Sequence, residues 1–185
     1  MDPAKLFTIG HSTRTLEQFL GLLQREGVSH LIDVRAFPVS ARYPHFSRPN
    51  LERTLTDTGS RYTHFPSLGG RRRGRRDSHN TQWRNASFRA YADYMDTREF
   101  NEALDDLLHL ARLEPTVIMC AEAVPWRCHR SLISDAVVAR GVPVYHILDS
   151  KTDAHRLTSF GRIDEGGRIR YDAAAQSDLF SAESP

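Results

Sequence analysis

The sequence has no hydrophobic run long enough to cross a membrane, and it has only two cysteines among 185 residues. A membrane-spanning helix needs about 18 or more apolar residues in a row. The N-terminus reaches an apolar segment at residues 6–9 without the pattern of a signal peptide. We therefore expect a soluble, cytoplasmic protein with no membrane partner. In such a chain the two cysteines are expected to be free thiols, metal ligands or a redox pair rather than a structural disulfide.

The net charge is also small, at a formal +2, but the positive charge is unevenly distributed. Five arginines lie within residues 71–76, and a solvated, flexible connection is the ordinary explanation for such a run. Aromatic and amide side chains follow directly, as in channels that bind phosphates with guanidinium groups and stack bases on aromatic rings. The segment therefore favours polyanion binding by Arg71, Arg72, Arg73, Arg75, Arg76, Trp83, Arg84 and Asn85.

The order of strand-like and helix-like patterns predicts a single three-layer α/β domain. A hydrophobic content of 39% is enough for one sizeable core. Alternation of the two patterns favours a mostly parallel open sheet with helices on both faces. We expect strands at residues 6–9, 30–35, 61–65, 116–119 and 142–147, and helices at residues 16–26, 51–58, 87–95, 100–113 and 131–138.

The C-terminal part of the sequence changes character after the last predicted parallel strand. We expect the α/β domain to cover residues 1–150, a hairpin extension to cover residues 151–172 and a flexible tail to cover residues 173–185. A Glu-Gly-Gly turn between alternating flanks predicts the hairpin. In the tail, Gln176, Leu179 and Phe180 resemble the bacterial sliding-clamp-binding peptide, although a serine replaces the usual leucine at its second position. The alternative is that Leu179 and Phe180 pack back onto the domain.

Polar residues gather where the predicted strands end. Both cysteines lie in residues 119–131, in a loop between a strand and a helix, which is where α/β proteins usually carry chemistry. A long aromatic loop at residues 37–49 follows the second strand, and loops of that length are often functional. The ends of the first, second and fourth strands would bring together Gly10-His11-Ser12, Asp33-Val34-Arg35 and Cys120-Ala121-Glu122.

Glu122 is the expected general acid or base of this group. Enclosure by Trp126 and apolar neighbours would raise the pKa of its carboxyl toward neutrality. His11 or His129 would share the proton transfer, and Asp33 is a further catalytic candidate.

The arginines near the strand ends are expected to hold an anion. Arg35 and Arg130 are each able to clamp a phosphate or carboxylate with two hydrogen bonds, and Arg127 lies in the same segment. The alternative is that Asp33 and Arg35 form an internal ion pair and that His129 caps or packs the following helix.

Cys120 has three interpretations, namely a nucleophile, a metal ligand or a buried small apolar group. Cys120, Cys128 and His129 are acceptable metal ligands by type, with His11 as a more distant one. However, seven residues separate the cysteines, and zinc sites are recognised by shorter paired spacings. We therefore predict no cofactor and keep a divalent metal as the minor alternative.

Several long motifs occur in a fixed order along the chain. They are Thr8-Ile9-Gly10-His11-Ser12, residues 31–35, Leu68-Gly69-Gly70, Trp83-Arg84-Asn85, residues 88–95, residues 119–122 and Cys128-His129-Arg130-Ser131. These motifs closely resemble the bacterial family called domain of unknown function 488, over nearly the whole chain. The resemblance implies a compact α/β domain and is consistent with an enzyme. A weaker likeness to rhodanese-type domains rests on the Asp-x-Arg after a strand and the cysteine loop before Arg-Ser.

A DNA-directed enzyme is the function that these features favour, of hydrolase or glycosylase type and acting in repair or on modified bases. The arginine run would grip phosphates, and Trp83 or Tyr43 would stack on an extruded base, with Ser12 also in the binding site. Two alternatives stay open: a cysteine-dependent, rhodanese-like transferase or hydrolase of a small anion, and a non-catalytic DNA-binding accessory protein.

Overall fold

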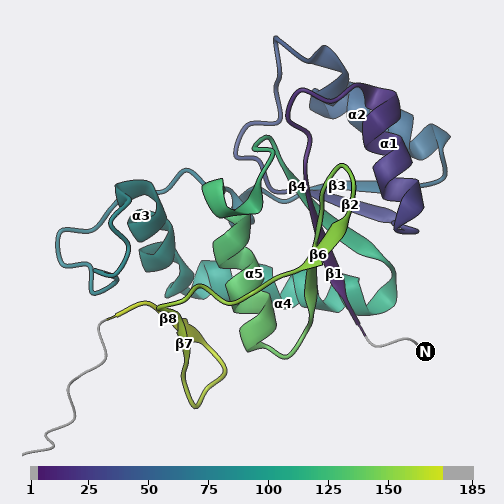
Figure 1. The fold of residues 1–185 in the computed structure, drawn as a ribbon. Helices are drawn as coiled ribbons and strands as arrows, with labels where there is room; N and C mark the ends of the chain where they lie inside the picture. The colour runs from purple at the N-terminus through teal and green to yellow at the C-terminus, as the bar shows by residue number, and fades with distance from the viewer. Residues whose placement is uncertain (1–3, 173–185) are drawn as a thin grey trace, which may run out of the picture.

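A six-stranded sheet with helices on both faces forms the body of the molecule (Figure 1). The computed structural model describes residues 4–172. The strand order is β3-β2-β4-β1-β5-β6. The strands are β1 (Leu6–Gly10), β2 (His30–Asp33), β3 (Arg61–His64), β4 (Thr116–Cys120), β5 (Val144–Ile147) and β6 (Thr152–Ala154).

The first five strands are parallel, and β6 pairs with β5 in the antiparallel direction. The predicted three-layer α/β domain with a mostly parallel open sheet is therefore confirmed. The sequence did not predict β6, which extends the sheet past residue 150. The expected domain boundary at that residue thus falls between two paired strands.

The helices divide between the two faces of the sheet (Figure 1). On one face lie α1 (Leu16–Arg25) and α2 (Arg48–Asp57), which bury Phe19 and Leu51 against the sheet. On the other face lie α3 (Ala86–Met95), α4 (Arg98–Leu113) and α5 (Arg130–Ala139).

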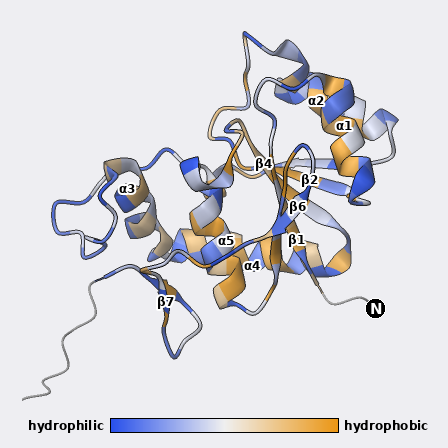
Figure 2. Cartoon of the chain, viewed as in Figure 1, coloured by the Kyte–Doolittle hydropathy of each residue, from blue (hydrophilic) through white to orange (hydrophobic). Residues whose placement is uncertain are grey.

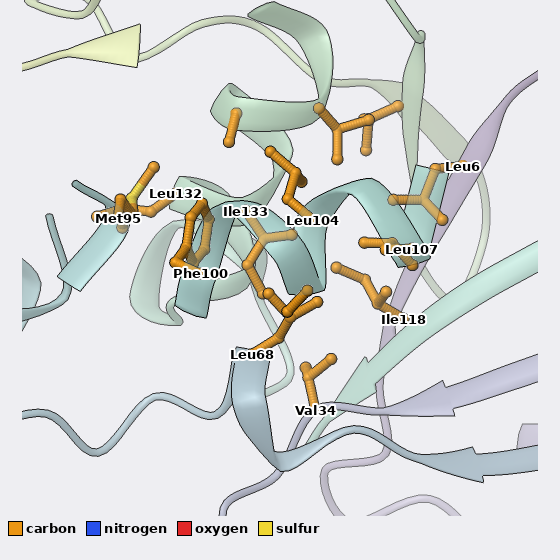
Figure 3. Packing of buried hydrophobic residues seen from close by; sticks show 14 of the residues in the cluster. Leu6, Val34, Leu68, Met95, Phe100, Leu104, Leu107, Ile118, Leu132 and Ile133 are labelled. Atoms are coloured by element: carbon orange, nitrogen blue, oxygen red, sulfur yellow. The ribbon is translucent and has the colours of Figure 1, made fainter. Parts of the chain in front are cut away.

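The central strands are buried along their whole length because helices cover both sides of them. All five residues of β1 and of β4 are buried. Successive side chains of a strand point to opposite faces, so Val117 and Met119 pack toward α1 and α2 whereas Ile118 and Cys120 pack toward α4 and α5. Figure 3 shows Ile118 near Leu107 in this second core. The alternation therefore directs the Cys120 side chain toward the α5 side.

Short-range signals in the sequence set the limits of the helices. Thr15 and Gln18 form a reciprocal capping box at the start of α1, and Thr97 caps α4. Gly27, two residues after the end of α1, has a positive φ of 64°, which glycine adopts readily. Figure 2 shows the hydrophobic side of these helices turned toward the sheet. Within residues 4–172, no helix combines the length and apolar character needed to cross a membrane.

A small hairpin, β7 (Arg162–Ile163) and β8 (Ile169–Arg170), follows the sheet and confirms that prediction. It is fastened to α5 through the buried carboxylate of Asp135. This carboxylate accepts hydrogen bonds from the Tyr171 hydroxyl (2.7 Å) and from the Thr158 hydroxyl (2.6 Å). The clamp-like peptide with Gln176, Leu179 and Phe180 lies outside the described residues.

Candidate functional site

A cavity of about 600 Å³ opens at the carboxyl ends of β1, β2 and β4. Its lining includes strand-end residues His11, Arg35 and Cys120, so the structure brings these separate segments together as the strand order requires. The remaining lining residues are Ser12, Thr13, Ala36, Phe37, Val39, Ser40, Arg42, Tyr43, Gly70, Arg71, Ser87, Phe88, Ala121, Glu122, Arg127, Cys128 and His129.

The loops that follow β1 and β4 run against each other at the floor of this cavity. The backbone N–H of His11 donates to the Cys120 carbonyl, and that of Ser12 donates to the Ala121 carbonyl, both at 2.9 Å. Ser12 has a φ of 49°, which is unusual for a residue with a side chain. Such strained backbone often marks functional sites. The Ser12 conformation turns the chain away from the sheet immediately after His11.

The two cysteines and His129 form a compact cluster on one wall of the cavity. Cys128 Sγ lies 3.5 Å from His129 Nδ1, and His129 Nε2 lies 3.2 Å from the Val34 carbonyl oxygen. A carbonyl only accepts hydrogen bonds, so Nε2 carries a hydrogen and Nδ1 is the ring nitrogen that faces Cys128. Both cysteines are buried and free.

The surroundings distinguish the two thiols. A hydrogen bond from Cys120, followed by the influence of His129, lowers the pKa of the Cys128 thiol well below its ordinary value. The same contact with Cys128, together with burial, raises the pKa of Cys120. Cys120 was the candidate nucleophile among its three interpretations, but His129 Nδ1, the nearby base, lies beside Cys128. The sequence feature that could have indicated this role for Cys128 is the histidine that directly follows it, His129.

His11 is buried and neutral. Burial lowers its pKa to about 4, and its ring stacks on Phe46 at a centroid distance of 4.4 Å. His11 Nδ1 donates to the Ser12 carbonyl (3.0 Å), which leaves Nε2 to accept from an Arg35 nitrogen at 3.4 Å. A base this weak, with both ring nitrogens engaged, is suited to orienting Arg35 rather than to the proton transfer predicted for it.

Asp33 and Arg35 form an internal ion pair, which was the alternative for these residues. The guanidinium contacts both carboxylate oxygens at 2.5–3.1 Å, and the Tyr62 hydroxyl donates to the same carboxylate at 2.7 Å. Asp33 is fully buried and does not line the cavity. Its expected catalytic role is therefore replaced by a supporting one beneath Arg35.

Arg130 is also structural rather than open to a ligand. It is 1% exposed, and its guanidinium donates to the Thr8 hydroxyl (3.3 Å) and to the Glu122 carbonyl. It does not line the cavity. The guanidinium expected to bind an anion thus binds a backbone carbonyl of the loop that carries Glu122.

Glu122 lines the cavity but is exposed, and Trp126 is 64% exposed. The expected enclosure of Glu122 by Trp126 is therefore wrong, because the turn η3 (Pro125–Arg127) directs the indole outward to solvent. His129 occupies the first position before α5 but makes no capping hydrogen bond with its side chain.

The arginine run at residues 71–76 is not uniform. Arg71 lines the cavity with its guanidinium 5.4 Å from the centre of the Phe37 ring, and Arg73 and Arg76 are exposed. Arg72 instead donates to the carbonyls of Gly69, Ser67 and Pro66 at 2.8–3.2 Å and stacks on Tyr94. Arg75 pairs with Asp77 at 2.8 Å. Among the described contacts, Arg71, Arg73 and Arg76 thus form no side-chain hydrogen bond or ion pair within the protein.

The residues that follow this run are part of the domain's own packing. The Trp83 indole packs edge-on against Phe88, Phe160 and Tyr171 at 4.9–5.3 Å and does not line this cavity. The Asn85 side chain caps α3 by accepting from two backbone N–H groups. Arg84 is exposed but does not line the cavity.

The loop after β2 supplies lining residues that the site prediction missed. Phe37, Val39 and Arg42 reach the cavity from this loop, together with the predicted Tyr43. Phe37 and Val39 are 64% and 77% exposed, which is high for large apolar side chains. The length and aromatic content of the loop were the available signal, but neither shows which side chains point inward.

The fold and the cavity define an α/β domain with a cysteine–histidine group at the carboxyl edge of a parallel sheet. The chain belongs to the family described as domain of unknown function DUF488, whose model matches residues 15–137. This match spans α1 to α5 and includes Cys120, Cys128 and His129. Comparisons with curated proteins and with solved structures gave no match.

Proposed function

We propose that this protein is an enzyme that acts on DNA, at a damaged or modified base, and that the cavity is its active site. The observation that carries the proposal is the combination, in one cavity, of reactive side chains with exposed arginines at the rim. A volume of about 600 Å³ lies within the range of small-ligand sites, which is large enough for a nucleotide unit.

The rim has the features that recognise a nucleic acid backbone and base. Arg42, Arg71 and Arg127 line the cavity and are exposed. Guanidinium groups bind phosphates in pairs of hydrogen bonds. Tyr43 and Phe37 lie on the same lining and offer aromatic faces to an extruded base, in place of Trp83.

Glu122 supplies a proton acceptor at the mouth of the cavity. In hydrolysis of a glycosidic bond, its carboxylate accepts a proton from the attacking water, and the water oxygen bonds to the sugar carbon. The base leaves with the electron pair of the broken bond and takes the proton from Glu122. The exposure of Glu122 is compatible with this step because water reaches it directly.

Incubation with duplex and single-stranded DNA carrying a panel of damaged or modified bases tests this proposal. We expect release of a base, salt-sensitive binding that weakens in Arg71→Ala and Arg127→Ala, and loss of turnover in Glu122→Gln. Arg112→Ala is the matched control. Arg112 is exposed in the last turn of α4, which leads to the amino end of β4, whereas the cavity lies at the carboxyl end of that strand. Binding without turnover on any substrate would identify a DNA-binding accessory protein instead. Absence of both would contradict the proposal.

A cysteine-dependent transferase or hydrolase of a small anion is the second candidate, and the Cys128–His129 contact favours it. The 3.5 Å separation and the anchored imidazole match the geometry of an activated thiol. In this case a small anion would slow alkylation of Cys128, and Cys128→Ser would abolish turnover while Glu122→Gln would not.

A further inference from the structure

We propose that Cys120, Cys128 and His129 bind a zinc ion with one coordination position open to the cavity. This inference rests on the proposed function for the use of the ion, and it favours hydrolysis over a thiol nucleophile. The three ligand atoms come from the end of β4 and from the start of α5.

The spacing of the ligand atoms fits a tetrahedral ion. The sulfur atoms of the two cysteines and a ring nitrogen of His129 all lie within 4.8 Å of one another. Zinc binds sulfur at about 2.3 Å and imidazole nitrogen at about 2.0 Å, so two such ligands of a tetrahedral ion stand roughly 3.5 Å apart. The observed distance between Cys128 Sγ and His129 Nδ1 is 3.5 Å.

The orientation of His129 is the one that a metal ligand requires. Histidine ligands usually donate their second ring N–H to a carbonyl or carboxylate, which fixes the tautomer and the ring plane. His129 Nε2 donates to the Val34 carbonyl, so the lone pair of Nδ1 is directed into the cluster. Gly70 packs against this ring, since an added Cβ there would stand 2.5 Å from Nδ1. The ring is therefore held in place before any ion arrives.

The chemistry of the donors selects zinc over harder cations. Thiolate and imidazole ligands suit zinc, whereas magnesium and calcium take oxygen ligands. Two thiolates neutralise the charge of Zn²⁺. The buried guanidinium of Arg130 lies nearby, and it would repel a site with net positive charge but not a neutral one.

The location indicates a catalytic rather than a purely structural ion. Two cysteines and one histidine form one of the ligand sets of catalytic zinc, in which water or substrate fills the fourth position. Cys120, Cys128 and His129 all line the same cavity as Glu122. When bound, zinc would make a coordinated water more acidic and polarise a substrate oxygen. The seven residues between the cysteines favoured the absence of a metal. In the structure, the loop that contains η3 folds back, so the two sulfur atoms lie close together despite this sequence separation.

Metal analysis of the full-length protein tests the site directly. The protein is purified under reducing conditions, stripped with a chelator and titrated with Zn²⁺ and with Co²⁺. We expect one zinc per chain and, with Co²⁺, the absorption of a tetrahedral ion with a thiolate-to-cobalt charge-transfer band. Cys120→Ser, Cys128→Ser and His129→Asn should each weaken zinc binding at least tenfold. His109→Gln is the control, because His109 is exposed on α4, and it should bind zinc normally.

Circular dichroism of each variant separates lost binding from lost folding. If a serine variant does not fold, thiol counting on the wild-type protein decides, because zinc should protect both thiols and release them when it is chelated. Failure of the reduced wild type to bind Zn²⁺ or Co²⁺, or zinc binding that all three variants retain, would overturn the proposal. The same preparations are assayed for DNA binding. DNA binding without a zinc site rejects only this inference, and a zinc site without DNA binding or base release rejects the proposed function.

Discussion

Gly10 and Glu122 lie in direct backbone contact, so that a Cβ added to Gly10 would stand 1.8 Å from the Glu122 carbonyl oxygen. The same Cβ would stand 2.9 Å from the Arg130 guanidinium, which donates to that carbonyl. The end of β1 therefore supports the loop that carries Glu122. Only glycine permits this approach, since both neighbours are fixed by other contacts.

Gly10→Ala is expected to destabilise the protein by about 3 kcal/mol, because the new methyl group meets backbone that cannot move aside cheaply. This corresponds to a fall in Tm of roughly 6–12 °C for a domain of this size. Gly21→Ala is the matched control, since a Cβ on this α1 glycine meets nothing within 4 Å. Thermal unfolding of both variants measures the difference. An unchanged Tm for Gly10→Ala would contradict the close contact.

Gly70→Ala is expected to displace the His129 imidazole, because its Cβ would stand 2.5 Å from Nδ1. Overall stability should change by less than about 1 kcal/mol, since Gly70 lies in a loop, whereas zinc affinity and turnover should fall at least tenfold. Gly74→Ala in the same loop is the control, because its nearest neighbour is an ordinary 3.8 Å contact with Ala90. Equal zinc affinity in the two variants would show that Gly70 does not position His129.

Arg72→Ala is expected to lower stability by about 2 kcal/mol, since it removes several charged hydrogen bonds to backbone carbonyls and the stacking on Tyr94. Arg71→Ala should leave stability within about 0.5 kcal/mol. For DNA binding we expect that Arg71→Ala reduces the slope of log affinity against log salt by about 1 if Arg71 contacts one phosphate. Urea unfolding and salt titrations measure both effects. Similar stability losses in the two variants would refute the assignment of Arg72 as the structural member of the run.

A buried hydrogen-bond chain connects Arg130 to the hairpin extension. It passes from Thr8 to His146 (2.8 Å), from His146 to His155 (2.9 Å) and from His155 to Asp135 (2.9 Å). Arg130 donates to the Thr8 hydroxyl, so that hydroxyl is free to donate to His146 Nδ1 and each later ring donates onward from Nε2. In this arrangement His146 Nδ1 accepts from the Thr8 hydroxyl, so a proton added at His146 Nδ1 would break the chain there.

Protonation of His146 should weaken the folded state at low pH. Burial lowers its pKa to about 4 from the ordinary 6.5, with a further contribution from nearby His155 and Arg130. Between these pH values the unfolded chain binds a proton that the folded chain does not, so stability falls as the pH drops from 6.5 toward 4. The expected loss is roughly 2–3 kcal/mol.

Resonance-specific NMR titration of the His146 ring measures this pKa, and unfolding at pH 7, 6 and 5 measures the stability. A His146 ring whose pKa is near the ordinary 6.5 would show that the buried chain does not form in solution.

Much of the architecture was predictable because it depends on local patterns. The apolar run at residues 116–119 and the helical spacing after Ser131 predicted β4 and α5, and the apolar spacing of residues 16–23 predicted α1. Parallel strand order then implied that His11, Arg35 and Cys120 meet at one edge. The missed strand β6 is three residues long and only partly buried, so it carries little periodic signal.

Roles of individual side chains were less predictable because they depend on neighbours distant in sequence. Trp83 resembles a stacking platform in the sequence, but Phe160 and Tyr171 from the C-terminal segment enclose it. Glu122 resembles a buried acid, but η3 directs Trp126 away from it. Neither outcome is encoded in the residues adjacent to Trp83 or Glu122.

The amino-acid order by itself determined where strands and helices lie, the parallel sheet, and the edge at which polar residues collect, because periodicity, caps and strand direction act over short stretches of chain. Tertiary structure alone decided that Cys128 faces His129 and Cys120. It also decided that the Arg130 guanidinium binds a carbonyl of the protein itself, whereas Arg71 lines the cavity. Those outcomes depend on distances through space between separate segments, and hydrogen bonding and burial act through those distances rather than through sequence separation.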